Sequence, residues 1–284
     1  MNRVSGHLGR LIFPGLLVLT AAFGLRCVYD WDVWWHLRTG QWIVENRAVP
    51  RVDPFSASAA GTEWIDLHWL FQLGLFGLHR ASGWWGPTLL QAGLAAATIA
   101  VLVAAIGGAQ VARRHVLVLL AAVLLLQTRL QMRPEVLSFL FLATTILAID
   151  RISRDGTNWP CAWRWLILVV VIQILWTNCH SLFVLGPVIG ATFALGSVLD
   201  TVLDRPVDGS MSARQRLVLA GLIPLAQLAA ALVNPYGWKG LAFPVQVFTR
   251  ISGTRPEFTE EISEFHPTLS LLPFSWAAWL AELV

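Results

Sequence analysis

The sequence predicts an all-α protein that crosses a membrane as a polytopic bundle of about seven to eight transmembrane helices. Its 284 residues are 56% hydrophobic and only 13% charged, with a mean hydropathy of +0.63. That composition is too apolar for one water-soluble core. Apolar segments recur along the whole chain, and unusual polar residues collect in a few segments between them. We therefore expect a single membrane module over residues 1–284.

Seven apolar segments are the expected spans. Several are shorter than the ~20 residues that a straight helix needs to cross the hydrocarbon layer, so their ends must extend into flanking residues. An eighth segment begins near Leu269 and stops at Val284, which predicts a chain truncated relative to a longer parent. The seven segments are Leu11–Val28, Trp85–Gly107, Val116–Thr128, Pro134–Ile149, Trp165–Thr177, Leu182–Val198 and Leu217–Val233.

The distribution of charge predicts the orientation. With the N-terminus inside, basic residues are denser in the inner loops, as the positive-inside rule requires, and acidic residues concentrate outside. Four polar segments then share the outer face: the loops 29–84 and 234–267 and the turns 129–135 and 178–181. We expect a multi-pass protein of the plasma (inner) membrane, with a cytoplasmic N-terminus and an active outer face.

Charge and cysteine content exclude several classes of function. The net charge of +3 comes without a run of basic residues, so we expect membrane lipid as a partner and no nucleic acid. The cysteines Cys27, Cys161 and Cys179 are too few and too scattered for a disulfide framework or a thiolate metal site. The absence of a visible internal repeat argues against a transporter built from repeated halves.

The first outer loop, residues 29–84, carries the densest aromatic cluster. Its start reads Tyr29-Asp-Trp-Asp-Val-Trp-Trp-His-Leu-Arg-Thr-Gly40, and tryptophan and tyrosine concentrate at the headgroup level of membranes. The spacing of apolar residues predicts interfacial helices over His36–Val44 and Trp64–Leu78, with a turn at Asp53-Pro-Phe-Ser56 between them. The bundle should therefore carry two helices lying across its outer end.

Asp30 and Asp32 are the candidate catalytic residues of this loop. An extended backbone would point both side chains to one side, whereas a helix would turn them apart. A carboxylate withdrawn from water by tryptophan rings has a raised proton affinity, which suits a general base. Asp32 can instead cap a helix that starts at Val33. The sequence leaves open whether a divalent cation binds these oxygens, although it gives no positive support for one. The cofactor is therefore left as unknown.

Two short outer turns supply candidate binding residues. Arg133 precedes Pro134 and Glu135 at the start of a span, where a guanidinium can bind a phosphate or simply mark the lipid interface. Asn178 and His180 lie in a turn so tight that both must sit at the membrane surface. A single histidine is more often a hydrogen-bonded structural residue. No other histidine or cysteine lies near His180 at the spacing of zinc ligands, so the sequence does not predict a zinc site.

Several motifs, in order along the chain, resemble multispanning bacterial proteins of the glycosyltransferase C (GT-C) type. The first is also similar to an element after the first span of oligosaccharyltransferase catalytic subunits, although the Trp-Trp-Asp acceptor motif of those enzymes is absent. The motifs are Asp32-x-Trp-Trp-His-Leu-Arg-Thr-Gly-x-Trp42, Pro50-x-x-Asp-Pro-Phe-Ser56, Gly61-x-x-Trp64, His68-Trp-Leu70, Arg133-Pro-Glu135, Trp176-x-Asn-x-His180 and Asn234-Pro-Tyr-Gly237.

The resemblance implies a membrane glycosyltransferase that moves a sugar from a polyprenyl-phosphate donor to an acceptor at the outer face. It assigns Asp32 as the base with Asp30 second, and it places the lipid phosphate on the two outer turns. The substrate-binding residues that follow from it are Arg133, His180, His36, Arg38, Asn178 and Glu135.

Two other classes of function stay open. One is a non-catalytic membrane protein that keeps the same scaffold for lipid binding or assembly. The other, ranked third, is a transporter, which should place ionisable residues in the middle of its spans. Here the spans carry few polar groups beyond Gln173 and Gln227.

Overall fold

The protein is all-helical. The computed structural model describes residues 2–26, 30–155, 159–203 and 212–253. It is 77% helix, and the described residues contain no strand, only an isolated bridge between Val52 and Glu63. The predicted fold class is therefore confirmed.

Three helices within the described ranges are long and apolar enough to cross a membrane. They comprise Trp85–Ala105, Glu135–Arg154 and Ser181–Val202. Three shorter apolar helices accompany them, at Leu11–Gly24, Val116–Gln127 and Cys161–Thr177. These helices and the apolar composition indicate a membrane protein.

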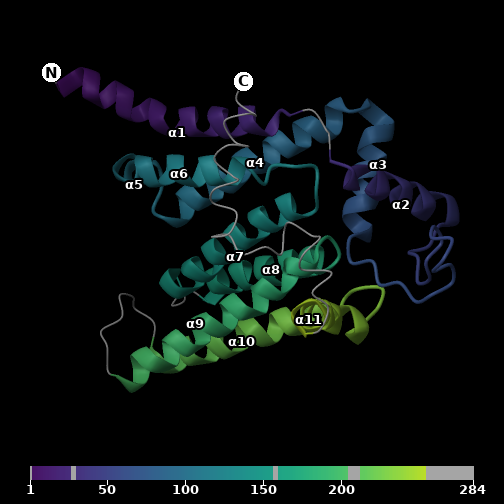
Figure 1. Ribbon diagram of the computed structural model, residues 1–284. Helices are drawn as coiled ribbons and strands as arrows, with labels where there is room; N and C mark the ends of the chain where they lie inside the picture. The colour runs from purple at the N-terminus through teal and green to yellow at the C-terminus, as the bar shows by residue number, and fades with distance from the viewer. Residues whose placement is uncertain (1, 27–29, 156–158, 204–211, 254–284) are drawn as a thin grey trace. The chain divides into compact units, whose positions relative to one another are not determined.

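Each of the seven predicted apolar segments is a helix (Figure 1). The eighth, from Leu269, lies outside the described residues. Ser212 begins the last of the seven with a capping box, in which its hydroxyl accepts from the backbone N–H of Gln215. The seven helices are α1 (Asn2–Gly24), α4 (Trp85–Ala105), α6 (Val116–Gln127), α7 (Glu135–Asp155), α8 (Trp159–Thr177), α9 (Leu185–Val202) and α10 (Ala213–Ala231).

The structure contains further helices that the sequence analysis did not predict. These are α5 (Ala109–Arg114), the short 3₁₀ helix η1 (Ser181–Val184) and α11 (Trp238–Gly253). The last corrects the expected loop over 234–267, because α11 starts directly after the Asn-Pro-Tyr-Gly turn. Residues 1–241 form one compact unit and 242–284 another. The site described below lies wholly within the first unit.

Two apolar cores hold the long helices of the first unit together. In one, α1 packs against α4 and α6 around Ile99 and Val123. In the other, α7, α8 and α10 meet around Ile152, Val169 and Ile223. Contacts between α4 and α7 connect the two groups of helices. The unit therefore brings the ends of helices far apart in sequence close to one another.

The loop after α1 folds into two helices, α2 (Asp32–Asn46) and α3 (Trp69–Ser82), packed against each other (Figure 1). Both were predicted, but α2 starts earlier and α3 starts later than expected. The delay has a local cause, since the Asp66 carboxylate accepts a hydrogen bond from the His68 backbone N–H and holds a turn there. The predicted turn at Asp53 is present, and its carboxylate accepts from the N–H groups of Phe55 and Ser56.

A glycine sets the close approach of α2 to α3. A Cβ atom added at Gly40 would lie 2.2 Å from the backbone oxygen of Gln72 and 2.7 Å from Cβ of Phe76. Because the first neighbour is backbone, the two helices would have to move apart. The absence of a side chain at Gly40 thus lets Gln72 reach the residues of α2.

We expect Gly40→Ala to destabilise the protein by about 1–3 kcal/mol, the usual cost of overpacking. Gly77→Ala is the matched control, because an added Cβ there meets nothing within 4 Å. The control should be neutral or slightly stabilising, since alanine favours helices. Thermal unfolding of both variants in lipid nanodiscs measures the difference, and equal effects would contradict the proposed close approach.

Candidate functional site

Arg133 holds two carboxylates from the loop after α1. Its Nε lies 2.5 Å from Asp30 Oδ2, and its Nη2 lies 3.1 Å from Asp30 Oδ1 and 3.0 Å from Asp32 Oδ2. The Asp30 side chain is 8% exposed and that of Asp32 is 59% exposed. Asp30 is therefore the fixed partner of the guanidinium, and Asp32 is the accessible one.

The backbone explains how these groups meet. Arg133 lies in the tight turn before α7, where its N–H donates to the Gln131 carbonyl at 2.7 Å. Asp32 is the first residue of α2 rather than its N-cap, which corrects the capping role considered for it. The Asp30 carboxylate instead accepts from the Asp32 backbone N–H at 3.2 Å. A carboxylate near the start of a helix is also favoured by the helix dipole.

The environment of the carboxylates differs from the predicted one. Burial by itself would raise the pKa of Asp30, but the hydrogen bonds and charge of Arg133 and the Asp32 N–H lower it below the usual value. Tryptophan rings do not shield Asp32 as expected: Trp31 is 86% exposed, and Trp34 packs edge-on against Trp84. The expected rise in proton affinity therefore does not occur at Asp30.

Three histidines lie next to this cluster in a row. The ring centroids of His36 and His68 are 5.9 Å apart, and those of His68 and His180 are 5.5 Å apart. Burial, together with the neighbouring histidines, lowers the pKa of His36 to about 4 and that of His180 to about 3. Both rings are consequently neutral at neutral pH, so neither supplies a positive charge for a phosphate.

Hydrogen bonds fix the orientation of His180. The Ser138 hydroxyl oxygen accepts from Nε1 of Trp176 at 2.8 Å and lies 2.7 Å from Nδ1 of His180. Because Ser138 already accepts one hydrogen bond, its own proton can go to the imidazole nitrogen. His180 then carries its N–H at Nε2, where it can act as a neutral donor.

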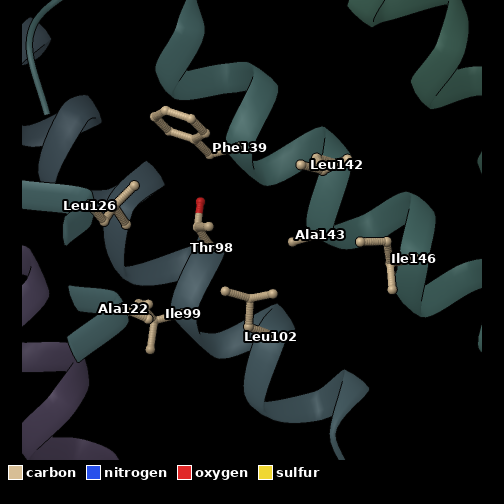
Figure 2. A pocket seen from close by; sticks show the side chains of 9 residues that line it. All are labelled: Thr98, Ile99, Leu102, Ala122, Leu126, Phe139, Leu142, Ala143 and Ile146. Carbon is tan, nitrogen blue, oxygen red and sulfur yellow. The ribbon is translucent and has the colours of Figure 1, made fainter. Parts of the chain in front are cut away.

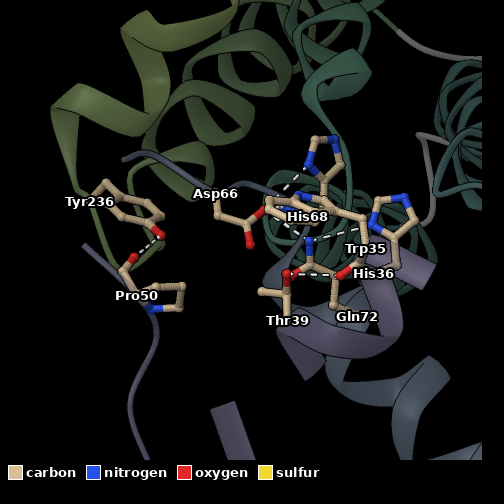
Figure 3. Close-up of polar contacts among 8 residues, drawn as sticks. All are labelled: Trp35, His36, Thr39, Pro50, Asp66, His68, Gln72 and Tyr236. Carbon is tan, nitrogen blue, oxygen red and sulfur yellow. Dashed lines mark hydrogen bonds and ion pairs between the residues drawn. The ribbon is translucent and has the colours of Figure 1, made fainter. Parts of the chain in front are cut away.

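The sequence analysis missed Asp66 and Gln72, which lie beside the histidines (Figure 3). Asp66 is 2% exposed, and its Oδ1 lies 3.4 Å from Nδ1 of His68. Gln72 donates from Nε2 to the same carboxylate oxygen at 3.3 Å, and this nitrogen lies 3.4 Å from Nδ1 of His36. Asp66 lies in a loop without a recognisable sequence motif. Its place in the site can therefore be seen only from the residues that surround it in the structure.

Tyr236, in the turn that the sequence marked at Asn234, extends this polar network. Its hydroxyl donates to the Pro50 carbonyl at 2.8 Å, and burial raises its pKa to about 12 (Figure 3). The Asn234 side chain holds the predicted turn by accepting from the Tyr236 backbone N–H. The turn after α10 is thus tied to the first loop.

Three other predicted binding residues have different surroundings. Asn178 is a structural link: its Oδ1 accepts from Trp69 Nε1, and its Nδ2 donates to the carbonyls of Ile174 and Val233. Both of its side-chain N–H groups are used in these contacts, and its role in substrate binding stays a prediction. The guanidinium of Arg38 instead lies over the ring of Phe55, with its Cζ atom 6.0 Å from the ring centroid. Glu135 is half-buried at the first position of α7.

The structure thus brings Asp30, Asp32 and Arg133 into direct contact and sets the histidine row beside them. His36 connects the two groups, because the charges of Asp30 and Arg133 act on it as well as those of His68 and Asp66. Segments far apart in the sequence therefore meet around Arg133 and the histidine row. In the described part of the chain, no three His, Cys, Asp or Glu side chains are placed to hold a metal ion.

No family model matches this chain, and the searches found no similar curated protein and no similar solved structure. The functional argument below therefore depends on the site geometry, together with the resemblance of the sequence motifs.

Proposed function

We propose that the protein is a membrane glycosyltransferase of the GT-C type, which transfers a sugar from a polyprenyl-phosphate donor to an acceptor. The observation that carries the proposal is the meeting of Arg133, two carboxylates and three histidines at one end of a set of apolar helices. A lipid-linked phosphate needs a cation at the headgroup level, and a transferred sugar needs polar groups close by.

In this proposal, Arg133 binds the donor phosphate by releasing one of its two carboxylate partners. The Asp30, Asp32 and Arg133 group carries a net charge of −1 when both acids are ionised, which repels a phosphate as it stands. Asp32, as the exposed partner, is the one that the phosphate replaces at Nη2. Asp30 stays bound and keeps the guanidinium oriented, because it is buried and contacts both Nε and Nη2.

An apolar cavity supports a lipid-linked donor. It has a volume of about 180 Å³ and lies between α4, α6 and α7, with side chains such as Leu102, Leu126 and Phe139 facing it (Figure 2). Phe139 is one helical turn beyond Glu135, so the α7 wall of the cavity begins about one turn from the segment that holds Arg133. A prenyl chain can lie there while its phosphate reaches the guanidinium.

The proposed topology is the one that charge predicts: seven to eight spans in the plasma (inner) membrane, a cytoplasmic N-terminus and the site at the outer face. The second candidate function is non-catalytic lipid binding on the same scaffold. It is favoured by one observation, namely that the carboxylates already neutralise Arg133 without a ligand.

Sugar transfer by the purified protein in nanodiscs, from a polyprenyl-phosphate sugar to a panel of hydroxyl acceptors, tests the proposal. We expect Arg133→Ala to weaken donor binding by about 1.5–3 kcal/mol, the worth of a charge-assisted hydrogen bond. Arg154→Ala is the matched control at the other end of α7, since Arg154 is exposed and its ion pair among the described residues is with Asp150, one turn away.

The two candidate functions give different results in this assay. Transfer by the unmodified protein, reduced in the Arg133 variant and unchanged in the Arg154 variant, supports the enzyme. Donor binding without transfer to any acceptor favours the lipid-binding scaffold. Equal donor binding by the protein and both variants would contradict a phosphate site at Arg133.

A further inference from the structure

The structure contains a carboxylate whose burial the fold does not explain. Asp66 is 2% exposed, and its Oδ2 is buried without a hydrogen-bond partner among the described residues. Burying a carboxylate costs free energy unless its oxygens are paired, and such unsatisfied groups call for an explanation. Its other oxygen, Oδ1, lies beside Nδ1 of His68.

We propose that His68, oriented by Asp66, is the proton acceptor of the transfer reaction. This inference rests on the proposed function and replaces Asp32 in that role. A carboxylate beside one ring nitrogen of a histidine favours the proton on that nitrogen and leaves the other with a free electron pair. Here Nδ1 faces Asp66, so Nε2 of His68 is the accepting atom.

The neighbouring groups are less suited to accept a proton. His36 and His180 are more buried than His68, and their Nδ1 atoms face the hydrogen-bond donors Gln72 and Ser138. Among the described residues, neither has a carboxylate in contact with its ring, whereas the side chain of His68 is 31% exposed and lies beside Asp66. Asp66 is thus a positioning residue that acts through His68.

The two carboxylates of the first loop are already engaged. Asp30 holds Arg133 through two hydrogen bonds, and Asp32 pairs with the same guanidinium. Both carboxylates are thus partners of Arg133, and Asp30 is held through both of its oxygens. His68 therefore remains as the accessible basic group of the cluster.

The position of the dyad relative to Arg133 suits the reaction. His36 is near both, since the charges of Arg133 and Asp30 act on it as well as those of His68 and Asp66. A sugar whose phosphate is on Arg133 can extend over His36 toward His68. The acceptor hydroxyl then approaches from the accessible side of the His68 ring.

The chemical step balances with these groups. The acceptor oxygen forms a bond to the anomeric carbon, while the bond from that carbon to the phosphate oxygen breaks. The electron pair of the broken bond stays on the polyprenyl phosphate, whose charge Arg133 stabilises. The hydroxyl proton moves to Nε2 of His68, and Asp66 stabilises the resulting imidazolium.

The test compares His68→Gln, Asp66→Asn and Asp32→Asn in the transfer assay. His79→Gln is the control, because His79 lies on α3 with its ring against Trp84, away from the cluster. We expect kcat to fall by about 10²–10⁴-fold in His68→Gln with donor binding unchanged, the usual contribution of a general base. Asp66→Asn should lower kcat with KM unchanged, Asp32→Asn should lower the KM for the donor because it frees Nη2 of Arg133, and the His79 variant should keep full transfer.

Nitrogen-15 NMR of the labelled protein adds a readout that does not depend on turnover or on the folding of any variant. In the unmodified protein His68 should carry its proton on Nδ1, and in Asp66→Asn the proton should move to Nε2. A proton on Nε2 in the unmodified protein would overturn the proposal, as would full transfer by His68→Gln or loss of kcat in Asp32→Asn alone. If the unmodified protein transfers no sugar at all, the proposed function itself fails.

Discussion

Asparagine at position 30 is expected to lower the free energy of unfolding by about 1.5–3 kcal/mol, the worth of hydrogen bonds to a charged group. Asp30 is 8% exposed and contacts Arg133 through both carboxylate oxygens. The asparagine amide has one acceptor oxygen and no negative charge. It therefore cannot accept the hydrogen bonds from both Nε and Nη2 of Arg133, and the guanidinium loses its fixed partner. Chemical unfolding of Asp30→Asn in detergent measures the loss.

The same pair predicts a dependence on pH. Because Arg133 and the Asp32 N–H lower the pKa of Asp30 in the folded protein, the stabilisation is present above its unfolded value of 3.8. It is lost as the pH falls through the lower folded pKa. The unmodified protein should therefore lose stability below about pH 4 more steeply than Asp30→Asn.

Asp32→Asn is the matched control for Asp30. Its carboxylate contacts the same guanidinium but is 59% exposed, and exposed ion pairs contribute only about 0–1 kcal/mol. Equal losses in the two variants would mean that burial does not distinguish the two acids. That result would contradict the proposal that Asp30 orients Arg133 while the donor phosphate replaces Asp32.

Trp176→Ala is expected to destabilise the protein by about 3–5 kcal/mol, as large core truncations do. Trp176 is fully buried near the end of α8, packs against Phe141 and donates to Ser138. Its removal leaves a cavity and also frees the Ser138 hydroxyl that orients His180. Unfolding in detergent should show the loss, accompanied by greater mobility of the His180 ring in NMR spectra.

Two controls separate packing from hydrogen bonding at this position. Trp176→Phe keeps most of the ring volume but lacks the N–H, so it should cost about 0.5–1.5 kcal/mol. Trp31→Ala removes a ring that is 86% exposed and should have little effect. If Trp176→Ala cost no more than Trp31→Ala, the core between α7 and α8 would not contribute as described.

Hydrophobic patterning was sufficient to predict the helices but not all of their limits. The seven apolar segments are helical because long apolar runs favour helices in a membrane, where backbone groups must pair internally. The helix α11 was not predicted, and it contains Pro244, a residue type that usually ends or kinks a helix. The start of α3 was misplaced because the turn at Asp66 depends on its carboxylate.

The candidate site was predicted in part. Arg133 and the acids near Asp30 could be found because charged residues beside apolar segments are conspicuous. Their pairing could not, since it joins segments a hundred residues apart. Asn178 was predicted as a binding residue, and its contacts with Trp69 and Val233 could not be predicted because they join segments distant in the sequence. Asp66 gave no sequence signal, because its burial is created by the packing of α2 and α3.

Affinity for polyprenyl phosphate, compared with the matching polyprenol in nanodiscs, tests the central claim most directly. The account predicts that binding needs the phosphate, that Arg133→Ala weakens it and that Asp32→Asn strengthens it. The last change removes the carboxylate that competes for Nη2 of Arg133. Equal affinity for the phosphate and the alcohol, or equal phosphate affinity in all three proteins, would contradict a phosphate site at Arg133.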